Sequence, residues 1–168
     1  IYPKELYDIY VIADYCTDST AEVAHRHGAY VLERCNKELG GKGYAMDWAF
    51  PKIFETGRHY DAFCVFDAAN LVHLDFLAVM NTRLMKGQKV LQGYLSAKNP
   101  VDTWVSGTFA IAFWTVNHLW HLGKYNLGLS SCLGGTGMCI SADIVREFGW
   151  GCDCLTEDME FSMKCLSH

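Results

Sequence analysis

Short apolar segments of strand length alternate with segments of helical spacing, and this alternation constrains the fold more than any other feature of the sequence. Residues 7–13 are rich in β-branched and aromatic side chains and stop at Asp14. Residues 62–66 are continuously apolar, as in a parallel strand buried on both faces, and stop at Asp67. Strands alternating with helices in this way are typical of a doubly wound α/β sheet.

The same patterns predict the remaining elements. Further strands are expected at residues 29–32 and 89–95 and just before Ser141, and helices are expected at residues 21–27, 44–54, 74–85 and 142–148. Ser19 and Glu22 have the spacing of a capping box, and Pro51 is expected to interrupt its helix. Ligands of such sheets bind beyond the carboxyl ends of the strands, so Asp14 and Asp67 are candidates for one crevice. Either aspartate alone could instead cap its own loop.

Composition excludes several classes of protein. The 168 residues suffice for one domain, and 51% hydrophobic with 20% charged residues is ordinary globular usage. The net charge of −5 and the scattered basic residues argue against a nucleic-acid partner. None of the eight cysteines forms a Cys-x-x-Cys pair, so we expect mostly buried, reduced thiols. Reduced thiols, together with the lack of a signal peptide at the start of the chain, favour a cytoplasmic location.

Residues 103–123 contain no Asp, Glu, Lys or Arg and are long enough to span a bilayer. The segment also holds polar residues, among them Ser106, Asn117 and His121, which are costly in lipid unless paired. We therefore expect a buried or interfacial helix whose aromatic side chains pack in the core rather than against a bilayer.

Two motifs near the end of the sequence are candidate site segments, one rich in glycine and the other acidic. Residues 133–137 read Leu-Gly-Gly-Thr-Gly, and such a turn allows close approach to a ligand, although it could equally be a strained turn without chemistry. Thr156 precedes Glu157 and Asp158 as a candidate helix cap, and acidic residues there also complement the helix dipole.

Five segments, taken in order, carry a resemblance to a known family. They are residues 14–20 (DYCTDST), 41–45 (GKGYA), 65–70 (VFDAAN), 133–137 (LGGTG) and 156–158 (TED). Together they closely resemble the family 2 glycosyltransferases, inverting enzymes of the GT-A fold, particularly the bacterial branch of cellulose and hyaluronan synthases. The resemblance covers nearly the whole chain. It implies a Rossmann-like three-layer α/β/α fold with a mostly parallel central sheet that lacks its first strand.

The resemblance also implies roles for particular residues. Asp14 matches the aspartate that contacts the nucleotide base, Lys42 lines the nucleotide side of the cleft, and Gly134, Gly135, Thr136 and Gly137 match the wall near the donor sugar and acceptor. Asp158 matches the catalytic general base, and Glu157 belongs to the same catalytic motif.

Asp67 opens the D-x-D motif, which in the family holds the Mg²⁺ or Mn²⁺ that bridges the pyrophosphate of a UDP-sugar. The second ligand position of the motif is occupied by Ala69, and a methyl group cannot coordinate a cation. The sequence therefore leaves two hypotheses open. One is a metal-dependent hexosyltransferase, and the alternative is a catalytically inactive nucleotide- or glycan-binding domain.

For the enzyme, the resemblance implies inverting transfer from a nucleotide sugar, UDP-linked, to a hydroxyl of a glycan or lipid-linked acceptor, as in polysaccharide biosynthesis. Residues 1–168 would form a single catalytic core, truncated at both ends relative to the family. Membrane helices of the parent protein would lie outside this chain and hold the domain at the cytoplasmic face of the membrane. A dinucleotide-binding oxidoreductase is disfavoured because no Gly-x-Gly-x-x-Gly follows a predicted strand with an acidic residue about 20 positions later.

Overall fold

The structure is a computed structural model that describes residues 2–152 and 154–167. Its strands form two sheets. The smaller sheet pairs β1 (Tyr10–Asp14) with β2 (Tyr30–Arg34), and the larger has the order β3 (Ala62–Val65), β5 (Met138–Ser141), β4 (Val90–Gln92). The α/β class expected from the sequence is confirmed.

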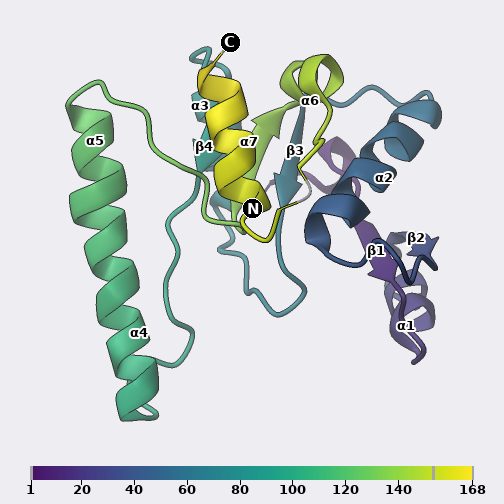
Figure 1. Cartoon of the computed structure of the whole chain (residues 1–168), viewed down its shortest axis with the longest axis horizontal. Coiled ribbons are helices and arrows are strands. Elements are labelled where there is room, and N and C mark those ends of the chain that lie inside the picture. The colour runs from purple at the N-terminus through teal and green to yellow at the C-terminus, as the bar shows by residue number, and fades with distance from the viewer. Residues whose placement is uncertain (1, 153, 168) are drawn as a thin grey trace.

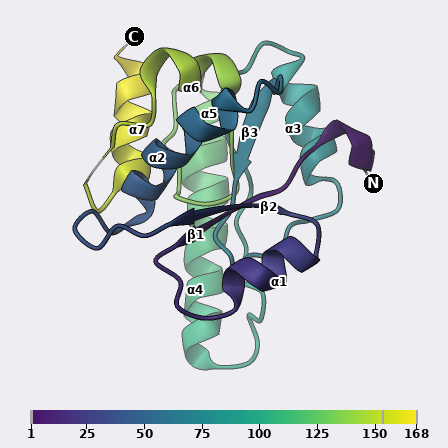
Figure 2. The ribbon, with the colours of Figure 1, turned by 90° about the vertical axis from the view of Figure 1, so that its right-hand side faces the viewer.

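The helices surround these sheets on both sides (Figures 1 and 2). In chain order they are η1 (Lys4–Leu6), α1 (Thr20–Arg26), α2 (Lys42–Glu55), α3 (Phe76–Leu84), α4 (Trp104–Thr115), the π-helix η2 (Val116–Leu122), α5 (Gly123–Asn126), α6 (Ala142–Phe148) and α7 (Glu157–Leu166). The stretch from α4 to α5 forms one continuous rod on the side of the molecule away from β1 and β2 (Figure 1).

The direction of β5 corrects the expectation of a mostly parallel sheet. β5 runs antiparallel to both of its neighbours, pairing Ala62 with Ser141 and Val90 with Ile140, whereas β1 and β2 are parallel. All four residues of β5 are buried. An apolar run reports burial on both faces of a sheet, and it carries no information on the direction in which the strand runs.

Two local expectations also differ from the structure. Ser19 makes no capping hydrogen bond, because the Asp18 carboxylate takes the role by accepting bonds from the backbone N–H and the hydroxyl of Thr20 at 3.0 and 2.5 Å. Pro51 lies inside α2 without interrupting it. Its ring is exposed, while the buried Phe50 and Ile53 on either side hold the helix against the core.

The core lies between the larger sheet and the helices α2, α6 and α7. Its buried members are Met46, Phe50, Leu133, Met138, Ile140, Val145, Trp150, Cys152 and Phe161. Trp150 stacks on Phe161 of α7 with ring centroids 4.3 Å apart, and the Phe50 ring of α2 lies 6.1 Å from Trp150 on centroids. These aromatic contacts fix α2 and α7 relative to the end of α6.

The eight cysteines are free thiols, and Cys139 and Cys152 are buried as expected. Burial, followed by the nearby Glu160 carboxylate, raises the pKa of the Cys152 thiol to about 11. Cys16, Cys35 and Cys154 are exposed, so the expectation of buried thiols holds only for part of the set.

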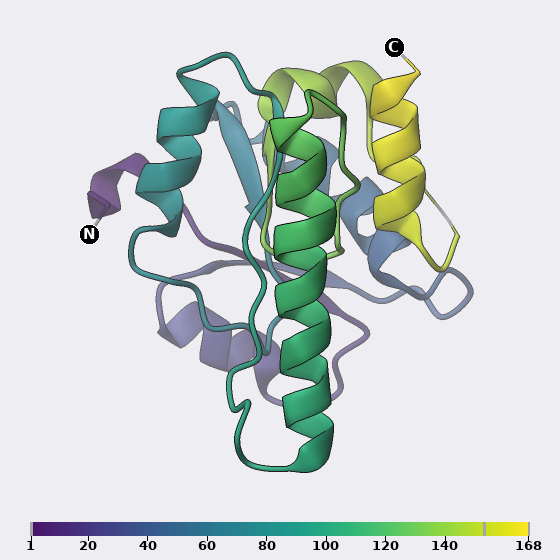
Figure 3. The ribbon, with the colours of Figure 1, turned by 90° about the vertical axis from the view of Figure 1, so that its left-hand side faces the viewer.

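The rod does not pack in the core, contrary to the expectation for residues 103–123. Trp104 is 83% exposed and Leu119 is 75% exposed, while the buried residues of α4 and η2 are Ala110 and Asn117. Figure 3 shows α4 reaching beyond the rest of the ribbon. Within residues 2–152 and 154–167, no helix has the length and apolar character needed to cross a membrane.

The chain is more open than a typical monomer of its mass. It exposes 11195 Å², whereas a compact monomer of 18.9 kDa exposes about 8,300 Å². An apolar helix gains stability mainly by burying its side chains, so the aromatic residues of the rod contribute little to folding here.

The contrast between the core and the rod gives a stability test. Ile140 in β5 is fully buried and Ile111 in α4 is 63% exposed. Ile140→Ala should lower the free energy of unfolding by about 2–5 kcal/mol because it leaves a cavity. The matched variant Ile111→Ala should change it by less than about 0.5 kcal/mol. Urea unfolding followed by circular dichroism measures both, and equal losses would contradict this assignment of the core.

Candidate functional site

Lys42 joins three segments that lie far apart in the sequence. Its ammonium nitrogen Nζ donates a hydrogen bond to Asp67 Oδ1 at 2.6 Å and another to the carbonyl oxygen of Gly135. Lys42 is the first residue of α2, Asp67 follows β3, and Gly135 lies in the turn that precedes β5. The structure therefore brings three of the predicted site segments together.

Thr136 strengthens the connection between the loop after β3 and the glycine-rich turn. Its hydroxyl oxygen accepts a hydrogen bond from the backbone N–H of Asp67 at 3.0 Å, and the hydroxyl donates to Oδ1 of Asn70. Both ends of the segment 67–70 are thus tied to the turn. This leaves the Asp67 carboxylate facing Lys42.

Gln92 holds the other side of the turn and is not among the predicted site residues. Its Oε1 accepts a hydrogen bond from the N–H of Gly134 at 2.7 Å, and its Nε2 donates to the carbonyl of Thr136 at 2.9 Å. The N–H of Gly93 also donates to the carbonyl of Gly137 at 2.8 Å. The signal that could have found Gln92 is the one that found Asp67, a polar side chain where an apolar strand ends.

Asp158 lies on the remaining side of the turn, in the first turn of α7. A Cβ atom placed on Gly135 would lie 3.3 Å from Oδ2 of Asp158, so this carboxylate sits against the turn. The other oxygen, Oδ1, accepts a hydrogen bond from the N–H of Met159 at 2.8 Å. Gly135 has a φ of 75°, which an L side chain rarely adopts. A cation and a carboxylate thus approach Gly135 from different elements.

Glu157 has different surroundings from Asp158. A Cβ on Gly43 would lie 3.3 Å from the Cβ of Glu157 and 2.2 Å from the carbonyl oxygen of Cys152. The first turn of α2 therefore packs directly on the backbone that leads into α7. Thr156 makes no side-chain cap to α7, contrary to the capping role considered for it.

Asp14 makes its contact elsewhere. Arg34, only 5% exposed, donates from Nη1 to Asp14 Oδ1 at 2.7 Å and from Nη2 to the carbonyl of Leu39 at 2.5 Å. Among the described residues, no hydrogen bond or ion pair joins Asp14 to Lys42, Asp67 or the turn. The single crevice expected for Asp14 and Asp67 is therefore not formed by direct contact.

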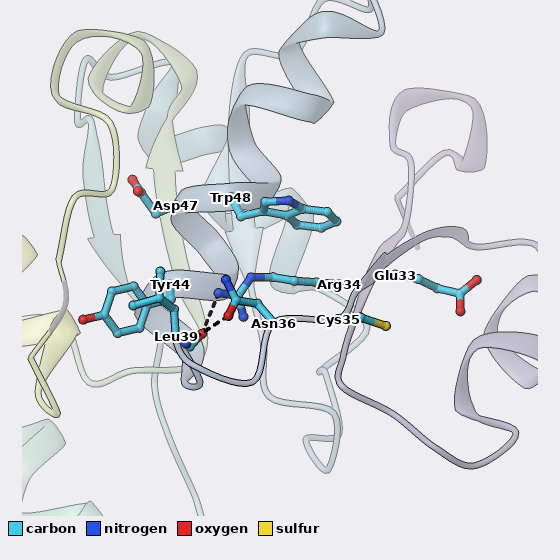
Figure 4. A pocket seen from close by; sticks show the side chains of 8 residues that line it. All are labelled: Glu33, Arg34, Cys35, Asn36, Leu39, Tyr44, Asp47 and Trp48. Carbon is cyan, nitrogen blue, oxygen red and sulfur yellow. Dashed lines mark hydrogen bonds between the residues drawn. The ribbon is translucent and has the colours of Figure 1, made fainter.

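A cavity of about 480 Å³ lies beside Arg34. It is lined by Glu33, Arg34, Cys35, Asn36, Leu39, Tyr44, Asp47 and Trp48 (Figure 4). Tyr44 and Trp48 are four residues apart on α2 and share one face, whereas Lys42, two residues before Tyr44, lies on the opposite face. The cavity and the Lys42 contacts are thus on different sides of α2.

Comparison with known protein families identifies the family of this chain. The family model described as "Glycosyltransferase like family 2" matches residues 1–168. The chain belongs to the glycosyltransferase 2 family. This confirms the family resemblance and supports glycosyl transfer in general, while the cellulose and hyaluronan synthase branch stays a prediction.

Comparison with individual proteins does not narrow the function beyond the family. No curated protein matches the sequence significantly. A solved structure titled "Crystal Structure of a Mycobacterial Protein" is similar over 82% of this chain, with 17% sequence identity and a TM-score of 0.47. This chain spans 44% of the length of that protein.

The residues around Asp67 do not fit the divalent cation that the family implies. Oδ1 of Asp67 already accepts a hydrogen bond from Lys42, and Oδ1 of Asn70 already accepts one from Thr136. Ala69 contributes no ligand atom. Within residues 2–152 and 154–167, no three His, Cys, Asp or Glu side chains are grouped to hold a metal ion. Mg²⁺ and Mn²⁺ favour carboxylate and water oxygens, and the 67–69 motif of this family 2 domain offers only the Asp67 carboxylate, which an ammonium already pairs.

Gly43 provides a test of the packing that positions Lys42. Gly43→Ala should lower the free energy of unfolding by about 1–3 kcal/mol, because the added methyl meets the fixed carbonyl of Cys152. Gly40→Ala is the matched control, since nothing lies within 4 Å of a Cβ at that position. Urea unfolding compares the two variants. A Gly43→Ala protein as stable as Gly40→Ala would show that α2 does not begin against this loop.

Proposed function

We propose that this family 2 domain transfers a hexosyl group from a nucleotide-sugar donor, UDP-linked, to a hydroxyl acceptor, with inversion at the anomeric carbon. The observation that carries the proposal is the position of Gly135, with the Lys42 ammonium bonded to its carbonyl and Oδ2 of Asp158 3.3 Å from where a Cβ on Gly135 would lie. The two charges that glycosyl transfer needs therefore flank one turn.

The carboxylate serves the acceptor. As the acceptor oxygen attacks the anomeric carbon, its proton must go to a base within hydrogen-bond reach, and Asp158 is the carboxylate placed beside the turn. The new C–O bond forms as the bond to the diphosphate breaks on the opposite face of the sugar, which inverts the configuration. Glu157 packs towards Gly43, so in this proposal it positions the first turn of α7 and does not touch the reacting atoms.

The cation serves the leaving group. Negative charge develops on the diphosphate as the glycosidic bond breaks, and a fixed cation stabilises this charge more effectively than water does. Lys42 supplies such a charge. The turn of residues 134–137 supplies a wall without bulky side chains on the sugar side. Asp14, held by Arg34, is proposed to contact the nucleotide base.

The acceptor is proposed to be a growing glycan or a lipid-linked saccharide at the cytoplasmic face of a membrane. This follows from the family's polysaccharide-synthesising branch, which the sequence resembles.

A second candidate is an inactive nucleotide- or glycan-binding domain. It is favoured by Ala69 and by the pairing of Asp67 with Lys42, because both remove ligands from the metal site on which the family depends. Transfer or hydrolysis of UDP-sugars by the folded chain would exclude it. Binding of UDP without any turnover would establish it.

Asp158 separates catalysis from binding. Asp158→Asn should lower the rate of sugar transfer by about 10²–10⁴-fold, the usual contribution of a general base. The affinity for UDP should stay within about twofold, because no bond to the nucleotide is assigned to this carboxylate. The rate is measured by release of UDP from UDP-sugars, and the affinity by calorimetry.

Asp143→Asn is the matched control. This aspartate lies in the first turn of α6, is exposed, and pairs with Arg146 at 3.5 Å. The control should transfer sugar at the rate of the unchanged chain. If Asp158→Asn loses nucleotide affinity and rate to the same extent, Asp158 is a binding group and not the base.

A further inference from the structure

The Lys42 ammonium pairs with a residue of the motif that, in the family, holds a divalent cation. It lies 2.6 Å from Oδ1 of Asp67, the carboxylate that opens the D-x-D motif. The side chain of Lys42 is 29% exposed and that of Asp67 is 53% exposed, so the pair lies at the surface of the site and not in the core. An incoming anion can therefore reach it.

The Lys42 ammonium has one N–H donor without an acceptor among the described residues. An ammonium group has three N–H donors, and in the described part of the chain Asp67 and Gly135 take two of them. The third donor is available to a phosphate oxygen. The backbone N–H groups of Gly135 and Thr136 also have no acceptor among the described residues, so the turn adds donors beside the ammonium.

The position of the ammonium is fixed from two directions. Asp67 is held by the bond from its own N–H to Thr136, and Gly135 lies in the turn that Gln92 binds on its other side. A cation that is held before the ligand arrives stabilises an anion without the cost of reorganisation. Asp67 thus anchors a lysine, which is a role that needs no carboxylate at position 69.

We propose that this domain binds the diphosphate of its donor without a divalent cation, with Lys42 in the place of the metal. The inference rests on the proposed function, because it names how the same donor is held. On transfer, the bond between the anomeric carbon and the diphosphate oxygen breaks, and its electron pair stays on that oxygen beside the Lys42 ammonium. The acceptor oxygen forms the new bond to carbon, and its proton passes to Asp158.

The test is calorimetric binding of UDP to the 168-residue chain, once in EDTA and once in Mg²⁺ or Mn²⁺. The dissociation constants should agree within about twofold. Lys42→Met removes the charge at similar length and should weaken UDP binding at least about tenfold in EDTA, consistent with one charge-assisted hydrogen bond. Lys42→Arg should recover part of the loss. Uridine, which has no phosphate, should bind more weakly than UDP.

Lys52→Met is the matched control, since Lys52 belongs to the same helix and lies over the Trp48 ring, away from the turn. It should bind UDP like the unchanged chain, and thermal melting should show that both methionine variants are folded.

Each contrary outcome has a distinct meaning. UDP binding that requires Mg²⁺ or Mn²⁺ would overturn the metal-free site and leave the proposed glycosyl transfer intact. Lys42→Met binding as tightly as the unchanged chain in EDTA would overturn the role of Lys42, and so would equal affinities for uridine and UDP. If the folded chain binds UDP under neither condition, both the metal-free site and the UDP-linked donor are wrong.

Discussion

The stacking of Trp150 on Phe161 is the contact on which the arrangement of the site depends. Trp150 follows α6, Phe161 belongs to α7, and Phe50 of α2 packs on the same indole. Burial of three aromatic rings stabilises this junction by several kcal/mol in total, at about 1.5–3 kcal/mol for each fully buried large side chain. Because α2 carries Lys42 and α7 carries Asp158, the same apolar contact sets the spacing of the two charges around the glycine turn. The polar groups then need only short bonds to reach Gly135.

The residue at position 69 affects how the neighbouring Asp67 carboxylate is neutralised. A D-x-D motif with both carboxylates would attract a divalent cation, and that cation would repel the Lys42 ammonium. With Ala69 in place, the single carboxylate of Asp67 is best neutralised by the nearest ammonium, and the pair is partly shielded from water. An ammonium carries one positive charge, whereas Mg²⁺ carries two. The Lys42 ammonium is, however, already held in the site, and it does not have to lose water ligands to reach octahedral coordination as Mg²⁺ does. The loss of a metal ligand is therefore compatible with retained binding of an anion.

Much of the fold could be predicted from residue patterns. The runs at residues 7–13 and 62–66 became β1 and β3, and Asp67 lies just after a strand as expected, because apolar runs report burial directly. Strand direction could not be predicted, since β5 would show the same apolar run in either orientation. The pairing of Lys42 with Asp67 was also out of reach, because it depends on how α2 packs across Gly43. Gln92 was overlooked for a simpler reason, as its strand was expected to continue to residue 95 while the ladder ends at Gln92.

Beyond the end of β4 at Gln92, Asn117 of the rod bonds the backbone of Leu95. Asn117 is 7% exposed, and its amide accepts from the N–H of Leu95 at 3.2 Å and donates to the carbonyl of Leu95 at 2.5 Å, as a neighbouring strand would. It lies in the π-helix η2, where the wider turn changes the direction of side chains and often marks a functional position. The Leu95 side chain in turn lies 3.1 Å from a Cβ placed on Gly137 and 3.5 Å from one placed on Gly134. The buried Asn117 amide thus connects the rod to the segment that packs on the glycine turn. His121 adds a hydrogen bond to Ser131, and the indole of Trp114 donates to Ser96 at 3.4 Å. Asn117 therefore has a structural role within residues 103–123, which contain no Asp, Glu, Lys or Arg.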